Sequence, residues 1–147
     1  MPNLFPEAEN PVTEQPQVTE AQVSFGRSWK FDFDKGEFVL TPTGKVAEAE
    51  GVQAWLEWCR KAIRTERYRY MIYSRNYGHE FEDLIARHLS REANESEIIR
   101  IVNETLMVDP RTAGVGNFTF QWEGDQCFFT CEVTNVLGQT GTIEGVF

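Results

Sequence analysis

Residues 118–133 read FTFQWEGDQCFFTCEV, the strongest secondary-structure pattern in the chain. Apolar and polar residues alternate on both sides of Gly124-Asp125, which is the period of two half-buried strands joined by a short turn. The pattern predicts an antiparallel hairpin with one face buried against the rest of the protein. That face contains Phe118, Phe120, Trp122, Cys127, Phe129, Cys131 and Val133. Phe128 is an apolar exception on the outward face, which we interpret as a docking contact, with a second small core as the alternative.

Further elements are predicted on both sides of this hairpin. Residues 140–147 form a third strand near a sheet edge. Upstream, apolar residues at helical spacing predict helices from Val52 to Glu66 and near Glu80–Leu89. A third helix is expected to open with a capping box at Asn94. It ends at Asp109-Pro110-Arg111, because proline disfavours helical geometry in the preceding residue.

Two side-chain arrangements follow from the helical patterns. In the first helix, Glu57 and Lys61 are spaced to form an ion pair on the solvent face. The second helix should bury Ile85 and Leu89 together with its other apolar residues.

The chain before the helices predicts a β-hairpin. Trp29, Phe31 and Phe33 alternate with charged residues, and residues 38–40 return as a strand after Lys35-Gly36. Strands, then helices, then strands are typical of the α+β class with a mainly antiparallel sheet. We therefore expect a single α+β domain over residues 29–147.

Residues 1–28 differ from the rest in composition. They hold four of the 6 prolines and four glutamates, and no basic residue precedes Arg27. Such a segment buries too little apolar surface to offset its ordering entropy. We expect an extended acidic arm, disordered in the free protein, and leave open whether it binds a partner.

Charge and cysteine content restrict the partners and the compartment. With 14 basic and 23 acidic residues, the net charge of -9 repels nucleic-acid phosphates and anionic lipid unless cations cluster. Cys127 and Cys131, four apart in one strand, lie about 13 Å apart, which is too far for a disulfide. We therefore expect buried thiols in a reducing compartment. Without a membrane-spanning run or signal peptide, we expect a protein that is cytoplasmic during assembly and has no membrane partner.

Acidic and histidine residues form no complete catalytic or metal motif. His79-Glu80 begins like a zinc-protease helix, but the second histidine of that motif is missing. Asp32–Glu37 lacks the ligand spacing of a calcium loop. Glu80, Glu82 and Asp83 could offer paired carboxylates for glycoside hydrolysis, but at a helix start they more simply complement the helix dipole. We expect no enzyme activity, no cofactor and no metal, and a lysozyme-like hydrolase ranks third among the hypotheses.

The segment between Arg60 and Arg75 interleaves basic and aromatic residues in an otherwise acidic chain. Such groups can follow a nucleic-acid backbone and stack on bases, so a small nucleic-acid-binding domain is the alternative hypothesis. Arginine and tyrosine are also enriched at protein interface hot spots, and we favour that interpretation, with no nucleic acid expected. The predicted interface residues here are Arg67, Tyr68, Arg69, Tyr70, Tyr73 and Arg75.

Three stretches of the chain resemble the XkdS-like proteins of PBSX-type particles. They are WKFDF at 29–33, VQAWLEWCRKAI at 52–63 and YRYMIYSRNYGHEFEDL at 68–84. These proteins belong with the baseplate wedge proteins of contractile phage tails, phage tail-like bacteriocins and type VI secretion systems. The similarity extends from residue 29 to about residue 135.

The resemblance implies a structural role and a set of partners. Members of the family carry Glu-Pro-Arg after the last helix, where it contacts the wedge core, and Asp109-Pro110-Arg111 occupies that place here. The alternative is that Asp109 and Arg111 only hold their own loop. The expected function is to link the wedge core to the first sheath ring and to nucleate sheath assembly through a sheet edge. Implied partners are other wedge subunits and the tail sheath protein, with the central hub or spike as a further candidate.

Overall fold

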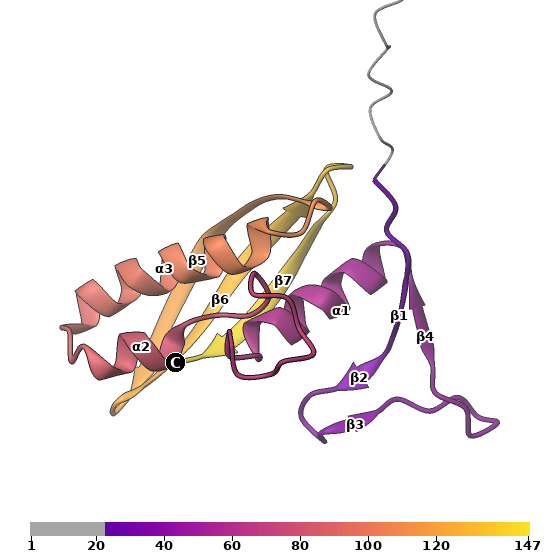
Figure 1. The fold of residues 1–147 in the computed structure, drawn as a ribbon, viewed down its shortest axis with the longest axis horizontal. Helices are drawn as coiled ribbons and strands as arrows, with labels where there is room; N and C mark the ends of the chain where they lie inside the picture. Colours follow the sequence, from indigo (N-terminus) through magenta and orange to yellow (C-terminus); the bar gives the residue numbers. More distant parts are fainter. Residues whose placement is uncertain (1–22) are drawn as a thin grey trace, which may run out of the picture.

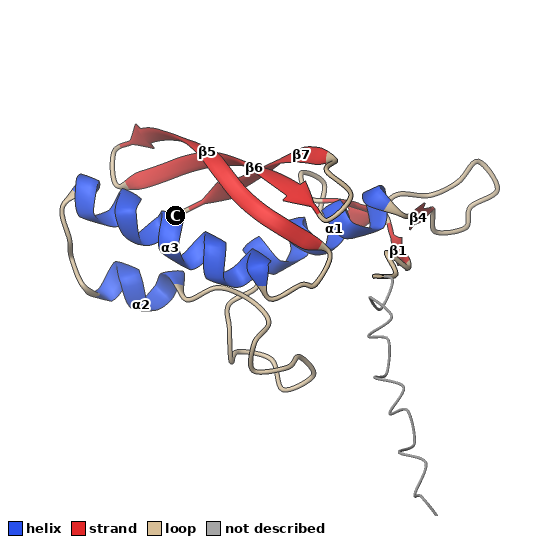
Figure 2. Ribbon diagram, turned by 90° about the horizontal axis from the view of Figure 1, so that it is seen from above, coloured by secondary structure: helices blue, strands red, loops and turns tan. Residues whose placement is uncertain are grey.

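The computed structural model describes residues 23–147, so the expected arm lies outside it up to residue 22. The chain folds into two layers, with a three-stranded antiparallel sheet covered on one face by helices (Figures 1 and 2). The helices are α1 (Val52–Ile63), α2 (Phe81–Ala86) and α3 (Arg91–Met107). The sheet has the order β5 (Thr112–Glu123), β6 (Gln126–Asn135) and β7 (Thr140–Val146). The predicted α+β class is confirmed.

The N-terminal part forms two small antiparallel pairs beside this body. β2 (Phe31–Asp32) pairs with β3 (Glu37–Phe38), which confirms the predicted hairpin. β1 (Arg27–Trp29) pairs with β4 (Glu48–Glu50), a pairing that the sequence pattern did not predict. The first strand therefore begins at Arg27, two residues before the expected start.

The core is built on the predicted face of the β5–β6 hairpin. Its four β6 residues are buried, and the three aromatic residues of β5 pack against the same cluster. Cross-strand pairing of Phe120 with Phe129 and of Trp122 with Cys127 places them on one side. From β7, Ile143 adds a fully buried side chain. All three cysteines are free and buried, as expected.

Two predictions about helix ends were wrong. α3 begins after Ser90, whose Oγ accepts the backbone N–H of Ala93 at 3.3 Å, so the cap is Ser90 and Asn94 lies inside the helix. α2 ends at Ala86, which leaves Ile85 55% exposed and Leu89 38% exposed. A helix of six residues presents only one narrow face to the core.

The expected Glu57–Lys61 pair is also wrong. Glu57 is buried and its Oε1 accepts from Arg60 at 3.2 Å. The Lys61 ammonium instead donates to the hydroxyl of Ser28 at 3.2 Å. The unpredicted β1–β4 pair packs on this side of α1, so a face that read as solvent-exposed is covered.

Candidate interaction surfaces

Asp109, Pro110 and Arg111 follow α3 and form the turn into β5. Asp109 is buried at 6% exposure, whereas Pro110 is exposed. The guanidinium of Arg111 donates to Asp109 through Nε at 2.9 Å and through a terminal nitrogen at 2.6 Å. Its other terminal nitrogen donates to the carbonyl oxygen of Phe25 at 2.7 Å. The pair therefore holds its own turn and ties the N-terminal segment to the end of α3.

This geometry favours the alternative in which Asp109 and Arg111 stabilise their own loop. The guanidinium fork suits bidentate pairing with a carboxylate, and here internal acceptors engage all three of its nitrogens. Pro110 is the exposed member of the tripeptide. A contact of the tripeptide with another subunit stays a prediction.

The loop between α1 and α2 has a tightly bonded base. The backbone N–H of Arg67 donates to the carbonyl oxygen of His79 at 2.7 Å. The backbone N–H of His79 donates in turn to the carbonyl oxygen of Thr65 at 2.9 Å. Gly78 has a φ of +98°, and a Cβ there would lie 2.5 Å from the Thr65 carbonyl oxygen. The carbonyl of Gly78 accepts from Arg67 Nε and from Thr105 of α3. These bonds fix the two ends of the loop to α1 and α3.

His79 and Glu66 form a close pair within this base. The Nδ1 atom of His79 lies 2.9 Å from Glu66 Oε2 and also accepts the N–H of Phe81 at 3.3 Å. Both contacts are satisfied together when Nδ1 is unprotonated and the proton lies on Glu66. Burial, aided by the charge of Arg67, lowers the pKa of His79 to about 4. Burial, followed by the charge of Glu82, raises the pKa of Glu66. The pair is therefore a hydrogen bond that the Glu66 carboxyl donates to Nδ1 of a neutral His79.

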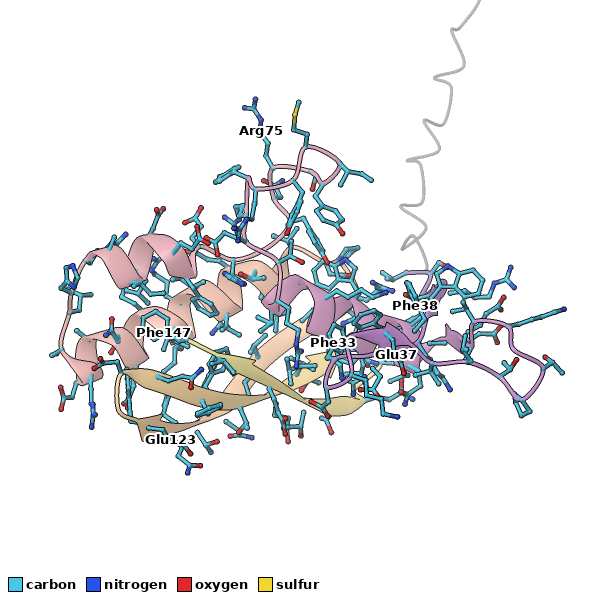
Figure 3. All side chains as sticks on the ribbon, turned by 90° about the horizontal axis from the view of Figure 1, so that it is seen from below. Phe33, Glu37, Phe38, Arg75, Glu123 and Phe147 are labelled. Carbon is cyan, nitrogen blue, oxygen red and sulfur yellow. The ribbon has the colours of Figure 1, made fainter. Side chains whose placement is uncertain are left out.

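Residues 68–76, which we call the 68–76 loop, project from the body of the molecule (Figure 3). At its tip, Met71 is fully exposed and Ile72 is 86% exposed. Aromatic rings continue from the loop toward α1, with centroid distances of 6.1, 4.6 and 5.8 Å along the series Tyr70, Tyr73, Tyr77 and Trp58. The loop therefore presents an aliphatic tip on an ordered aromatic support. Tyr68, Tyr70 and Tyr73, predicted as interface residues, are all exposed.

Most of the cations near this loop have internal partners. Arg67 pairs with Glu80 at 3.3 Å and is 14% exposed, and Arg69 pairs with Glu82 at 3.2 Å on the surface. Arg60 pairs with Glu57, and the Arg64 guanidinium lies over the ring of Phe33 at 4.3 Å. Arg75 extends outward from the loop (Figure 3). A continuous row of free cations, which backbone tracking of nucleic acid requires, is therefore not formed by these residues.

The outer edge of β7 offers regularly spaced backbone groups. Cys127 and Phe147 exchange both backbone hydrogen bonds, and antiparallel pairing alternates from there along β6 and β7. Every second residue of β7 therefore directs its N–H and C=O away from β6, where residues 23–147 supply no further strand. These outward residues are Thr140, Thr142, Glu144 and Val146. The predicted edge position of the last strand is confirmed.

A groove of about 710 Å³ lies beside this edge and extends over the outward face of the sheet to Gln121 and Glu123 of β5. Its lining includes Glu144 and Val146 from β7 and Asp34 and Arg64 from the opposite side. Phe128, 37% exposed, is the cross-strand partner of Val146 and also lines the groove. The predicted outward position of Phe128 is confirmed, and its docking role stays a prediction.

Residues 23–147 bring together no group of three or more histidine, cysteine or acidic side chains suited to a metal ion. Over the same range, no helix is both long and apolar enough to cross a membrane.

The unpaired outer edge of β7 and the exposed apolar tip of the 68–76 loop are surfaces of the kind that other proteins bind. The fold is similar to that of a chain in the cryo-EM structure of the anti-feeding prophage (AFP) baseplate. The TM-score is 0.51 at 17% identity, over 83% of this chain and 84% of that chain.

Sequence comparison gives the family. Residues 27–138 match the contractile injection system sheath initiators. The chain is 32% identical over 146 residues to the phage-like element PBSX protein XkdS of Bacillus subtilis (strain 168), covering 92% of this chain and 97% of that protein. The chain belongs to the contractile injection system sheath initiator family. It is a structural baseplate component of a contractile injection system, as its resemblance to XkdS-like proteins predicted.

Proposed function

We propose that this protein starts the tail sheath by accepting a strand of the sheath protein at the outer edge of β7. This role is supported by the row of outward N–H and C=O groups on Thr140, Thr142, Glu144 and Val146. An added strand gains main-chain hydrogen bonds from such an edge and specificity from the side chains beside it. The groove along β7 provides the space for that strand.

The other edge of the sheet is less suited to this role. β5 departs from regular pairing with β6 twice, between Thr112 and Gly114 and between Gly116 and Thr119. Bulges twist an edge and interrupt the spacing of its backbone groups, which discourages addition of a strand. β7, in contrast, pairs with β6 without a register shift.

The remaining parts of the proposed role follow from the family. The protein connects the wedge core, and through it the hub or spike, to the first sheath ring. Its predicted wedge contacts are the exposed Pro110, with Asp109 and Arg111 behind it, and the 68–76 loop. The role is structural and requires no catalysis, and the protein is made in the cytoplasm before it enters the baseplate.

The test replaces one outward N–H of β7 and leaves the internal ladder intact. In Glu144→Pro, a donor at the edge is lost, and proline is tolerated on edge strands where its nitrogen faces solvent. Particles made with this variant should contain it in their baseplates but carry little or no sheath by electron microscopy. Glu144→Ala, which keeps the N–H, is the matched control and should assemble sheath.

Full-length sheath on Glu144→Pro particles would contradict the proposal. Deletion of residues 140–147 is a poorer test, because it removes the buried Ile143 and one strand of a three-stranded sheet. Loss of sheath after that deletion would not separate misfolding from loss of the edge.

A further inference from the structure

We propose that the 68–76 loop is a plug for an apolar socket with an acidic rim on a baseplate subunit other than the sheath. Met71, fully exposed, and Ile72, 86% exposed, form its aliphatic tip. The sheath is assigned to the β7 edge by the proposed function, and the identity of this second partner rests on that assignment.

The loop is built to hold its tip in place before binding. Gly78 admits no side chain, and its carbonyl is held from two directions by Arg67 and Thr105. Above this base, the rings of Tyr70 and Tyr73 pack edge to face at 6.1 Å. A preformed loop loses little conformational entropy on binding, which favours a specific contact.

Charge indicates the chemistry of the partner. Residues 67–79 contain Arg67, Arg69 and Arg75 and no acidic residue, in a chain with a net charge of -9. Arg67 and Arg69 already face Glu80 and Glu82. Arg75, which extends beyond the body of the molecule, is the cation best placed to meet acidic groups around a socket (Figure 3).

The direction of the loop separates it from the sheet surface. Arg75 at the loop and Glu123 at the end of β5 lie on opposite sides of the molecule (Figure 3). Tyr70 of the loop is close to β7, because Tyr70 and Val146 line the same cleft. The tip residues, rather than Tyr70, are therefore the ones that distinguish this contact from the sheath contact.

A protein partner explains the tip better than nucleic acid does. Met71 and Ile72 have no π face on which a base can stack. Of the three arginines in residues 67–79, Arg67 and Arg69 have internal carboxylate partners. A buried aliphatic anchor beside an arginine is, in contrast, a common form of protein interface centre.

The first test is the double variant Met71→Ser/Ile72→Ser in the full chain. Both side chains are exposed, so the unfolding midpoint in urea should stay within error of the wild type. Incorporation into particles, measured by quantitative mass spectrometry, should fall roughly tenfold or more, as expected for the loss of an interface anchor. Leu40→Ser, at a 60% exposed aliphatic residue outside the loop, is the matched control and should be incorporated normally.

Normal incorporation of the double variant would overturn the proposal, as would an equal loss in the Leu40→Ser control. If the double variant is incorporated but lacks sheath, the loop serves the sheath and the proposal is wrong. The proposed function has a separate readout, because Glu144→Pro should be incorporated without sheath.

The second test identifies the occupant. A photo-crosslinking amino acid in place of Ile72, activated in intact particles, should join this chain to one baseplate protein. The crosslinked peptide should combine aliphatic or aromatic residues with aspartate or glutamate. A crosslink to sheath, to a second copy of this chain or to nucleic acid would overturn the proposal, and so would the absence of any crosslink.

Discussion

Arg111 and Asp109 form a forked ion pair whose shortest contact is 2.6 Å, with 14% and 5% of their side chains exposed. The same guanidinium reaches the carbonyl of Phe25, 86 residues earlier in the chain. The Asp109–Arg111 pair is therefore a structural link between the start of the described chain and the end of α3. Its role in folding and any role in docking can be separated by measurement.

Arg111→Ala should destabilise the protein by roughly 3 kcal/mol, because it leaves the buried Asp109 carboxylate without its cation. Arg111→Lys should recover only part of this loss, since an ammonium cannot make the forked contact. Urea denaturation followed by tryptophan fluorescence measures both values. A variant with wild-type stability that fails to enter baseplates would instead support the interface interpretation.

Gly78→Ala should cost roughly 2 kcal/mol or more, since it adds a Cβ 2.5 Å from the Thr65 carbonyl and strains a residue with a positive φ. Gly44→Ala is the control, with a φ of +81° and open space around the glycine. The difference between their unfolding free energies isolates the steric contact. Equal losses would show that the base of the 68–76 loop yields to the added methyl group.

Ser90→Ala should lower stability by about 1 kcal/mol, because it removes the side-chain cap of α3. Asn94→Ala should cost less than Ser90→Ala. It removes one bond from the side-chain amide to the Leu89 carbonyl at 3.3 Å, but it also removes a buried Oδ1 that has no partner. Thermal unfolding of the two variants compares them directly. A larger loss for Asn94→Ala would support the capping box expected at that residue.

His79 should make stability fall on mild acidification. Its pKa is about 4 in the folded protein and 6.5 ordinarily, so between these values the unfolded chain binds a proton that the folded chain does not. The loss should accumulate as pH falls from about 6.5 toward 4, reaching roughly 1–3 kcal/mol. The raised pKa of Glu66 acts in the opposite direction and offsets part of it.

The measurement compares unfolding free energies at pH 7 and pH 4.5 for the wild type and His79→Asn. The asparagine oxygen can replace Nδ1 as an acceptor for the N–H of Phe81 without titrating. The drop should therefore be smaller in the variant. An identical drop in both proteins would show that His79 does not contribute to the acid sensitivity.

Much of the central fold could be predicted from local patterns in the sequence. The alternation around Gly124-Asp125 set the β5–β6 hairpin, its buried face and the outward position of Phe128, because strand side chains must alternate. The edge position of the last strand was also predicted correctly. The resemblance of residues 29–33, 52–63 and 68–84 to XkdS-like proteins indicated the family from the amino-acid sequence alone.

Contacts between residues far apart in the chain could not be predicted from local patterns. The β1–β4 pair packs against α1, and Glu57 of that helix, which local periodicity assigned to solvent, is buried. The hydrogen bond from Arg111 to the Phe25 carbonyl joins residues that are 86 positions apart in the chain. Periodicity reports which residues share a face of one element, whereas burial and ion pairing depend on which other element covers that face. For this protein, local patterns in the sequence therefore indicated most of the elements and the family, and packing decided which of its charged residues are buried and which are exposed.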